Sequence, residues 1–206
     1  MNAKHIVIFA CLLLLALGCK KLEKANLYYY YSGEKVYLDV RKDMVFLLFE
    51  DGLSDTQKQA FVRSDSALHP WRFMGKTVDG SDGGKYAVLV AGTRISQSTV
   101  DKFLNMEGTK AVSYMCEYEG TPMAATNKFS VMLKGTTNLS QVEDLAKRYG
   151  CSVGQEEWAV SGVYEITVPK TVSMGTVRLS CLFYETGLFE WTSPNFIAFG
   201  NFFDAT

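Results

Sequence analysis

Histidine is almost absent from this chain of 206 residues, which contains only His5 and His69. A Ser-His-Asp triad, a Cys-His dyad and the common zinc sites all depend on an imidazole. His5 falls in the apolar N-terminal segment, so any such site would have to use His69. That residue precedes Pro70 and Trp71, with Asp65 as the nearest carboxylate, and a lone histidine at the start of an apolar strand is typical of a structural role.

Other signatures of catalysis are also missing. The sequence contains no Gly-x-Ser-x-Gly elbow, phosphate loop, His-Glu-x-x-His helix or calcium loop. The stretch Asp79–Asp82 brings oxygen ligands together but has no second cluster at a calcium-binding spacing, and it predicts a turn. Neighbouring carboxylates at Glu117 and Glu119, and at Glu156 and Glu157, fit solvated sheet edges better than acid–base catalysis. We therefore expect no enzyme, no cofactor and no metal site.

Cysteines are few, and their spacing matches no zinc or redox motif. Beyond Cys11 and Cys19 the chain has Cys116, Cys151 and Cys181, an odd number that leaves at least one free thiol or an interchain bond. We interpret these three as small buried apolar residues, with one disulfide as the alternative.

Charge of one sign is lacking as well. The chain has 21 basic and 22 acidic residues and a formal charge of −1. Nucleic-acid binding depends on a basic surface that neutralises phosphates, so this balance argues against a nucleic-acid partner. After the first residues, no apolar run is long enough to cross a bilayer as a helix.

The N-terminus reads as a targeting segment. Lys4 precedes the apolar run Ile6–Leu17, which is too short for a permanent transmembrane helix. Leu15-Ala-Leu-Gly-Cys19 resembles a bacterial lipobox, although Ala16 stands where leucine is usual. We predict that residues 1–18 are a lipoprotein signal peptide and that Cys19 is lipidated, with an ordinary secretory peptide as the alternative.

Lipidation at Cys19 implies a protein anchored to the outer membrane or elsewhere in the cell envelope. The residues that follow include Lys20, Lys21 and Lys24 and no acidic run. Such a run is associated with surface-exposed lipoproteins in some Gram-negative lineages, so its absence favours the periplasmic side.

Tyrosine is concentrated at the start of the mature chain. Leu27–Leu38 contains four consecutive tyrosines and a Ser-Gly-Glu turn, which predicts an aromatic hairpin. We assign 19–39 to the lipidated cysteine, a tether and this hairpin. The tyrosines either pack onto the first domain or offer an aromatic surface to a partner.

The rest of the sequence is an internal repeat of strand, helix, strand, strand, helix, strand. In the first half, the apolar run Met44–Phe49 predicts a buried strand and Ser54 with Gln57 a helix cap. In the second, Asn138 caps a helix and Gly187 stops another. The predicted fold class is α+β, with two tandem ferredoxin-like βαββαβ units whose antiparallel sheets carry helices on one face. The first unit covers 40–120, a linker covers 121–127, and the second unit with a C-terminal tail covers 128–206.

Two passages resemble a known family. They are Tyr28-Tyr-Tyr-Tyr31-Ser-Gly-Glu-Lys35-Val-Tyr-Leu38 and Leu182-Phe-Tyr-Glu-Thr186-Gly-Leu-Phe-Glu-Trp191-Thr-Ser-Pro-Asn195-Phe. Both are similar to the N-terminal prodomain of a branch of bacterial subtilisin-like serine proteases, which they open and close respectively. Because the chain stops at Thr206, where the protease would begin, the resemblance does not extend to proteolytic activity.

What the resemblance implies is a binding role as a protease inhibitor or folding assistant. Such a prodomain docks its sheet on the protease and runs its C-terminal strand into the substrate cleft. The alternatives are that this tail only completes the last strand and packs locally, and that the chain binds another envelope protein or a glycan without any protease link. The residues expected to contact the partner are Pro194, Asn195, Phe196, Phe199, Phe202 and Phe203.

Overall fold

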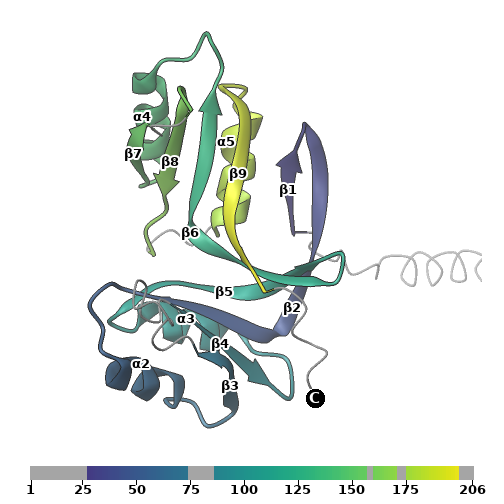
Figure 1. Ribbon diagram of the computed structural model, residues 1–206, viewed down its shortest axis with the longest axis vertical. Helices are drawn as coiled ribbons and strands as arrows, with labels where there is room; N and C mark the ends of the chain where they lie inside the picture. Colours follow the sequence, from purple (N-terminus) through teal and green to yellow (C-terminus); the bar gives the residue numbers. More distant parts are fainter. Residues whose placement is uncertain (1–26, 74–85, 157–159, 171–174, 200–206) are drawn as a thin grey trace, which may run out of the picture.

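The computed structural model describes residues 27–73, 86–156, 160–170 and 175–199. These residues form an α+β fold, as predicted, and its strands belong to one nine-stranded antiparallel sheet with four helices (Figure 1). The strands are β1 Leu27–Tyr31, β2 Glu34–Phe49, β3 Leu68–Phe73, β4 Tyr86–Ala91, β5 Thr109–Tyr118, β6 Thr121–Leu133, β7 Ser152–Glu156, β8 Val163–Thr167 and β9 Phe189–Ala198. The helices are α2 Asp55–Val62, α3 Gln97–Asn105, α4 Leu139–Arg148 and α5 Thr176–Glu185.

The same element order occurs twice within this sheet. The first half runs β2, α2, β3, β4, α3, β5 and the second runs β6, α4, β7, β8, α5, β9. The strands are ordered β3-β4-β2-β5 in the first half and β7-β8-β6-β9 in the second. In both halves the first strand therefore lies between the third and the fourth, and the second strand forms an outer edge.

The two halves share one continuous sheet, which corrects the predicted boundaries. Residues 121–127, expected to be a linker, form the start of β6, and Cys116 on β5 pairs with Met123 on β6. Glu119 and Gly120 take positive φ values of 49° and 77° and close a tight hairpin, so the strand resumes at once. The boundary predicted at residue 40 also falls inside a strand, because β2 passes without a break from the hairpin into the first half.

Local sequence signals explain where most helices begin. The capping box predicted at Ser54 is present at the start of α2, and Asn138 forms a second one with Gln141 at the start of α4. Helix α3 begins at Gln97, with Ser96 as its cap, because the Ser96 hydroxyl accepts a hydrogen bond from the Thr99 amide at 3.2 Å.

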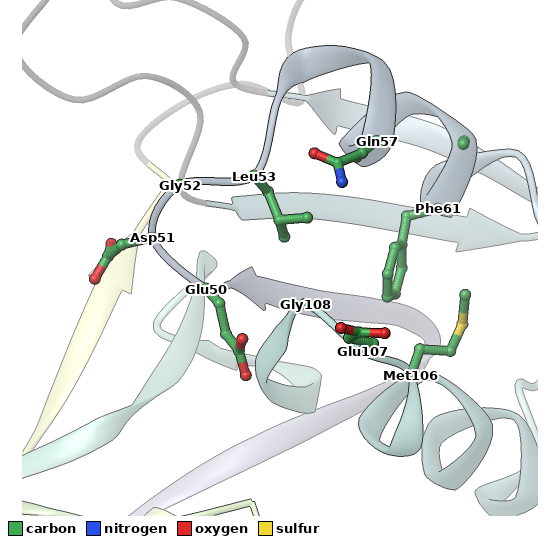
Figure 2. Close-up of a pocket in the computed structure, with 10 residues that line it drawn as sticks. Glu50, Asp51, Gly52, Leu53, Gln57, Phe61, Met106, Glu107 and Gly108 are labelled. Carbon is green, nitrogen blue, oxygen red and sulfur yellow. The ribbon is translucent and has the colours of Figure 1, made fainter.

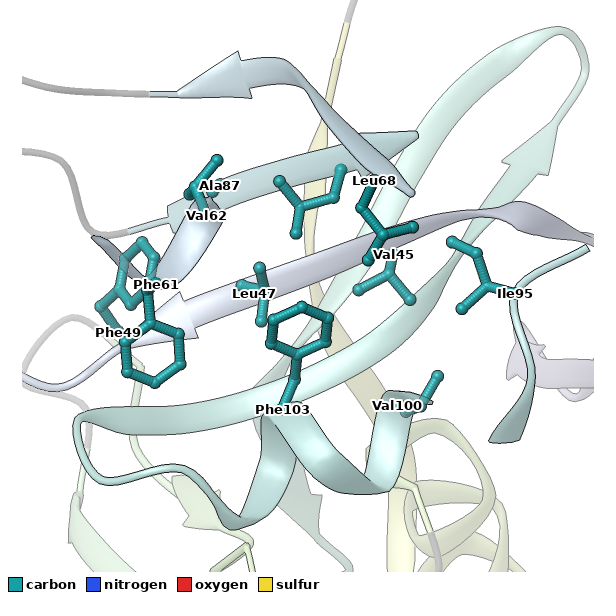
Figure 3. Close-up of a cluster of buried hydrophobic side chains, with 11 residues drawn as sticks. Val45, Leu47, Phe49, Phe61, Val62, Leu68, Ala87, Ile95, Val100 and Phe103 are labelled. Carbon is teal, nitrogen blue, oxygen red and sulfur yellow. The ribbon is translucent and has the colours of Figure 1, made fainter. Parts of the chain in front are cut away.

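Each half has its own core between the sheet and its two helices. In the first half, α2 and α3 pack on the same face of the sheet (Figure 3). In the second half, α4 and α5 likewise cover one face. The first core contains Val45, Leu47, Phe49, Phe61, Val62, Leu68, Ala87, Leu89, Ile95, Val100 and Phe103. The second contains Phe129, Val131, Val142, Leu145, Ala146, Ile166, Val168, Leu179, Phe183 and Phe189.

The opposite face of the first half is also buried. Met44, Phe46 and Val88 on this face have no more than 2% of their surface exposed. They form a third cluster with Ala124 of β6 and with Phe199, which follows β9. The ends of the second half's strands therefore cover the helix-free face of the first half (Figure 1).

Candidate functional site

Several of the predicted contact residues are engaged within the chain. The Phe196 ring lies 5.5 Å from the Tyr29 ring and packs in the cluster that holds the N-terminal hairpin. Phe199 is buried, its ring lies 5.6 Å from that of Tyr86, and its amide donates to the Pro122 carbonyl at 2.8 Å. These contacts favour the alternative in which the tail completes the last strand. Phe202, Phe203 and the predicted lipidation site Cys19 lie outside the described residues.

Pro194 and Asn195 are neighbours on β9 whose side chains point to opposite faces of the sheet. Pro194 is buried opposite Phe129. Asn195 is half-buried, and its side-chain amide donates to Glu165 on β8 at 3.3 Å. Asn195 therefore lies on the helix-free face of the second half. Among the described contact positions, only Asn195 reaches a polar surface.

This helix-free face, which we call the open face, is polar and accessible. The Lys128 ammonium lies 2.5 Å from one carboxylate oxygen of Glu165, and the Ser130 hydroxyl donates to Asn195 at 3.4 Å. A connected network thus joins β6, β8 and β9 and fixes the direction of its side chains. The open face consists of Lys128, Ser130 and Met132 on β6, Glu165 on β8, and Trp191, Ser193 and Asn195 on β9, all half-buried or exposed.

Trp191 gives this polar face an aromatic group. It pairs with Met132 across the β6–β9 ladder and is 36% exposed. An accessible tryptophan beside an ordered polar network is a frequent arrangement at protein-binding surfaces, because tryptophan combines a large apolar area with a hydrogen-bond donor. The sequence alternation in β6 would have placed Lys128, Ser130 and Met132 on this face, but not Trp191, since β9 has an irregular register at that point.

A second candidate surface lies on the aromatic hairpin. Ser32 and Gly33 have φ values of 50° and 83°, as a two-residue hairpin turn requires, and Tyr28 pairs with Tyr37 while Tyr30 pairs with Lys35. Cross-strand partners share a face. The Tyr184 ring of α5 stacks on the Tyr30 ring at 4.3 Å. We call Tyr28, Tyr30, Lys35, Tyr37 and Tyr184 the tyrosine face.

Polar contacts order the tyrosine face. The Lys35 ammonium lies 4.2 Å from the centre of the Tyr28 ring, and hydrogen bonding to Tyr28 raises the pKa of Lys35. Glu185 accepts hydrogen bonds from the phenols of Tyr28 at 3.4 Å and Tyr30 at 2.9 Å. Desolvation, followed by this bond to Glu185, raises the pKa of Tyr30, which therefore stays a neutral donor. Residues of the opening and closing passages thus meet in space.

An open hollow of about 510 Å³ lies at the end of the first half, between the loops that follow β2 and α3. Figure 2 shows Leu53 and Phe61 pointing toward it. Gly108, with φ of +86°, leaves room for Leu53, since a Cβ there would lie 2.7 Å from the Leu53 Cδ1 atom. Two acidic residues around the hollow form ion pairs. A carboxylate oxygen of Glu50 lies 3.8 Å from the Lys170 ammonium, and one of Asp51 lies 3.2 Å from the Lys110 ammonium. Its lining is Glu50, Asp51, Gly52, Leu53, Gln57, Ala60, Phe61, Met106, Glu107 and Gly108.

His69, Glu117 and Glu156, considered above as candidate catalytic groups, lie on strands or take part in contacts within the chain. His69 lies on the exposed edge strand β3, opposite Val90. Glu117 forms an ion pair with Arg41 at 3.3 Å, and Glu156 accepts from the Ser161 hydroxyl at 3.0 Å and from the Gly162 amide. The Gly162 amide is the main reason that the pKa of Glu156 is lowered.

The three described cysteines are free thiols. Cys116 and Cys181 are buried, as predicted, whereas Cys151 is only half-buried. Within the described part of the chain, no group of three or more His, Cys, Asp or Glu residues could hold a metal ion. No helix in that part is long and apolar enough to span a bilayer.

Comparison with known proteins gives little. No family model matches the chain, and neither does any curated protein. One solved structure, a Sxl-lethal protein–RNA complex, aligns with 77% of this chain and 99% of its own, at a TM-score of 0.34 and 15% sequence identity.

Proposed function

We propose that this protein is a non-catalytic lipoprotein of the cell envelope that binds a subtilisin-like serine protease as a separate prodomain. In this proposal the two halves are tandem ferredoxin-like units, Cys19 carries the lipid anchor, and the chain faces the periplasm. Binding either inhibits the protease or assists its folding. The observation that carries the proposal is the open face, because the family that the chain resembles docks through its sheet.

The contacts of the closing passage support this assignment. Glu185 binds the tyrosines of the opening passage, Phe189 is buried in the second core, and Trp191 and Asn195 lie on the open face. One short passage therefore both fastens the hairpin and supplies the accessible groups of the surface.

The structure reduces the number of tail residues that are available to contact the protease. Phe196 and Phe199 pack inside the protein, so we assign cleft binding to residues 200–206 and surface binding to Trp191 and Asn195. A partner that binds through β9 and the following residues would use extended backbone pairing for affinity and side-chain pockets for selectivity.

The direct test is binding of the mature chain with Cys19→Ser to subtilisin-type proteases of the same envelope. We expect a complex at micromolar concentration or tighter, measured by calorimetry and by loss of proteolysis. Trp191→Ala should weaken it at least about tenfold, as truncation of a central aromatic anchor does. Leu139→Ala is a matched control, because Leu139 at the start of α4 is 38% exposed against 36% for Trp191 but lies away from the open face.

A second variant distinguishes the role of residues 200–206 from that of the open face. A chain that ends at Phe199 keeps the buried ring and its bond to Pro122, so it should fold normally. Loss of inhibition with retained binding would support cleft insertion by residues 200–206. Absence of any complex with these proteases at micromolar concentration would contradict the proposal and leave binding of another envelope protein or a glycan as the alternative.

A further inference from the structure

The tyrosine face has an unusual composition for an exposed surface. Tyr37 is 55% exposed, and Tyr28, Tyr30 and Tyr184 are half-buried, so their rings and hydroxyls reach the surface together. The other face of the hairpin is used inside the protein, where Leu27, Tyr29 and Leu38 join the cluster around Cys116 and Val177. The hairpin is thus held by one face and by the contacts of Tyr30 with Tyr184 and Glu185, and it presents tyrosines on the other face.

This chemistry fits the interfacial region of a lipid bilayer. Tyrosine combines an apolar ring with a polar tip and is enriched at membrane–water boundaries. Lysine can bury its methylene stem while its ammonium stays in water. On the tyrosine face, Lys35 lies over a tyrosine ring, and the carboxylate of Glu185 is bound by two phenols rather than left to repel the headgroups.

The predicted anchor limits how far this face can lie from a membrane. Cys19 precedes the first residue of β1, Leu27, by eight positions. Eight residues span at most about 29 Å when fully extended. An acyl chain on Cys19 would therefore hold the hairpin within one domain diameter of the bilayer surface, at a high effective concentration.

We propose that the tyrosine face rests on the lipid bilayer and so orients the protein on the membrane. The inference rests on the lipid anchor of the proposed function, and it leaves the open face of the second half available to a partner. Lys35 and Asp39 point to the same side of β2, so their opposite charges cancel there. Contact of the tyrosine face with the bilayer should therefore depend on burial of aromatic rings and only weakly on salt concentration.

The test uses the mature chain with Cys19→Ser, so that no acyl chain contributes, and vesicles of phosphatidylethanolamine with phosphatidylglycerol. We expect measurable partition in flotation, and Tyr37→Ser should reduce the partition coefficient about fivefold, as expected when one aromatic side chain leaves the interface. The matched control is Tyr31→Ser, because Tyr31 is 69% exposed but lies on the opposite face of the same hairpin. That variant should partition like the unsubstituted chain.

A second measurement detects contact of the hairpin with the bilayer even where partition of the non-acylated chain into vesicles is weak. The acylated protein is placed on bicelles that contain a headgroup spin label, and broadening of amide signals is recorded. Broadening at Lys35 and Tyr37 with none at Val153 of β7 would support the inference. Equal effects of Tyr31→Ser and Tyr37→Ser, or no preferential broadening in the hairpin, would overturn it.

These readouts are independent of the protease proposal. Vesicle partition is measured without the acyl chain or a protease, and the protease complex is measured without lipid. If Tyr37→Ser leaves partition unchanged but weakens binding to peptidoglycan sacculi, the tyrosine face is a saccharide site and the membrane assignment is wrong.

Discussion

The two halves of this protein use the same element order but treat the helix-free face of their sheets in opposite ways. In the first half that face is apolar, with Phe46 and Val88 fully buried. In the second half it carries Lys128, Glu165 and Asn195 in a polar network. The cover over the first face comes from the ends of β6 and β9, which bring Ala124 and Phe199 onto it.

The two faces therefore differ in whether they are packed inside the protein or accessible at its surface. A sheet face in a small domain is either packed or solvated, and its residues follow from that choice. The helix-free face of the first half packs against residues of the second half, whereas that of the second half stays accessible. The comparison leads to predictions that test it directly.

The largest expected effect is at Phe46. Replacing this fully buried ring in Phe46→Ala should lower the free energy of unfolding by about 3–5 kcal/mol, because it leaves a cavity between the halves. Met132→Ala, on the open face of β6, should cost less than about 1 kcal/mol. Urea unfolding followed by circular dichroism measures both values. Similar losses for the two variants would mean that the faces are not different.

Phe199 should matter to the first half although it belongs to the second. A chain that ends at Ala198 loses the buried ring and the bond to Pro122, so we expect its free energy of unfolding to fall by about 3 kcal/mol relative to a chain that ends at Phe199. Thermal unfolding of the two truncated chains provides the measurement. Equal stability would show that the contact with Tyr86 contributes nothing in solution.

Removing the capping residue of the first helix should lower the free energy of unfolding by a similar amount in each half. Ser54 and Asn138 both form capping boxes, so Ser54→Ala and Asn138→Ala should each cost about 1 kcal/mol. Chemical denaturation of the single variants and of the double variant measures the two costs and their additivity. A cost at only one of the two sites would show that the repeat in sequence does not carry over to energetics.

The smallest effects concern the thiols. Burial raises the pKa of Cys116 to about 12 and that of Cys181 to about 11, from an ordinary value of 9.0. These groups leave stability unchanged below pH 9 and lower it as pH rises toward 12, because only the unfolded state then ionises freely. At pH 8, iodoacetamide should modify the half-buried Cys151 before Cys116, as mass spectrometry of digests would show. Faster modification of Cys116 would contradict its burial.

Local signals in the sequence predicted much of this fold. The capping residues Ser54 and Asn138 and the stop at Gly187 act through the backbone next to them, so they are legible without the fold. The strand at 121–127 was missed because Gly120, Pro122 and the polar residues to Asn127 read as a joint between the halves. Residues 121–125 instead pair with β5 and β9.

The candidate site was less predictable. Phe196 and Phe199 resembled free apolar groups because the rings that they contact, Tyr29 and Tyr86, are more than 100 positions away in the sequence. Asn195 was identified through the resemblance, but its bond to Glu165 depends on the pairing of β6 with both β8 and β9. Contacts of this kind arise only once the sheet has formed.

The central claim is that the open face of the second half is the surface that binds a protease. It is tested most directly by amide chemical shifts of the mature chain, recorded while an inactivated subtilisin-type protease is added. The account predicts shifts in β6, β8 and β9 that centre on Ser130, Glu165 and Trp191, with none in α2 or α3. Shifts confined to the first half, or the absence of shifts at saturating protease, would contradict it.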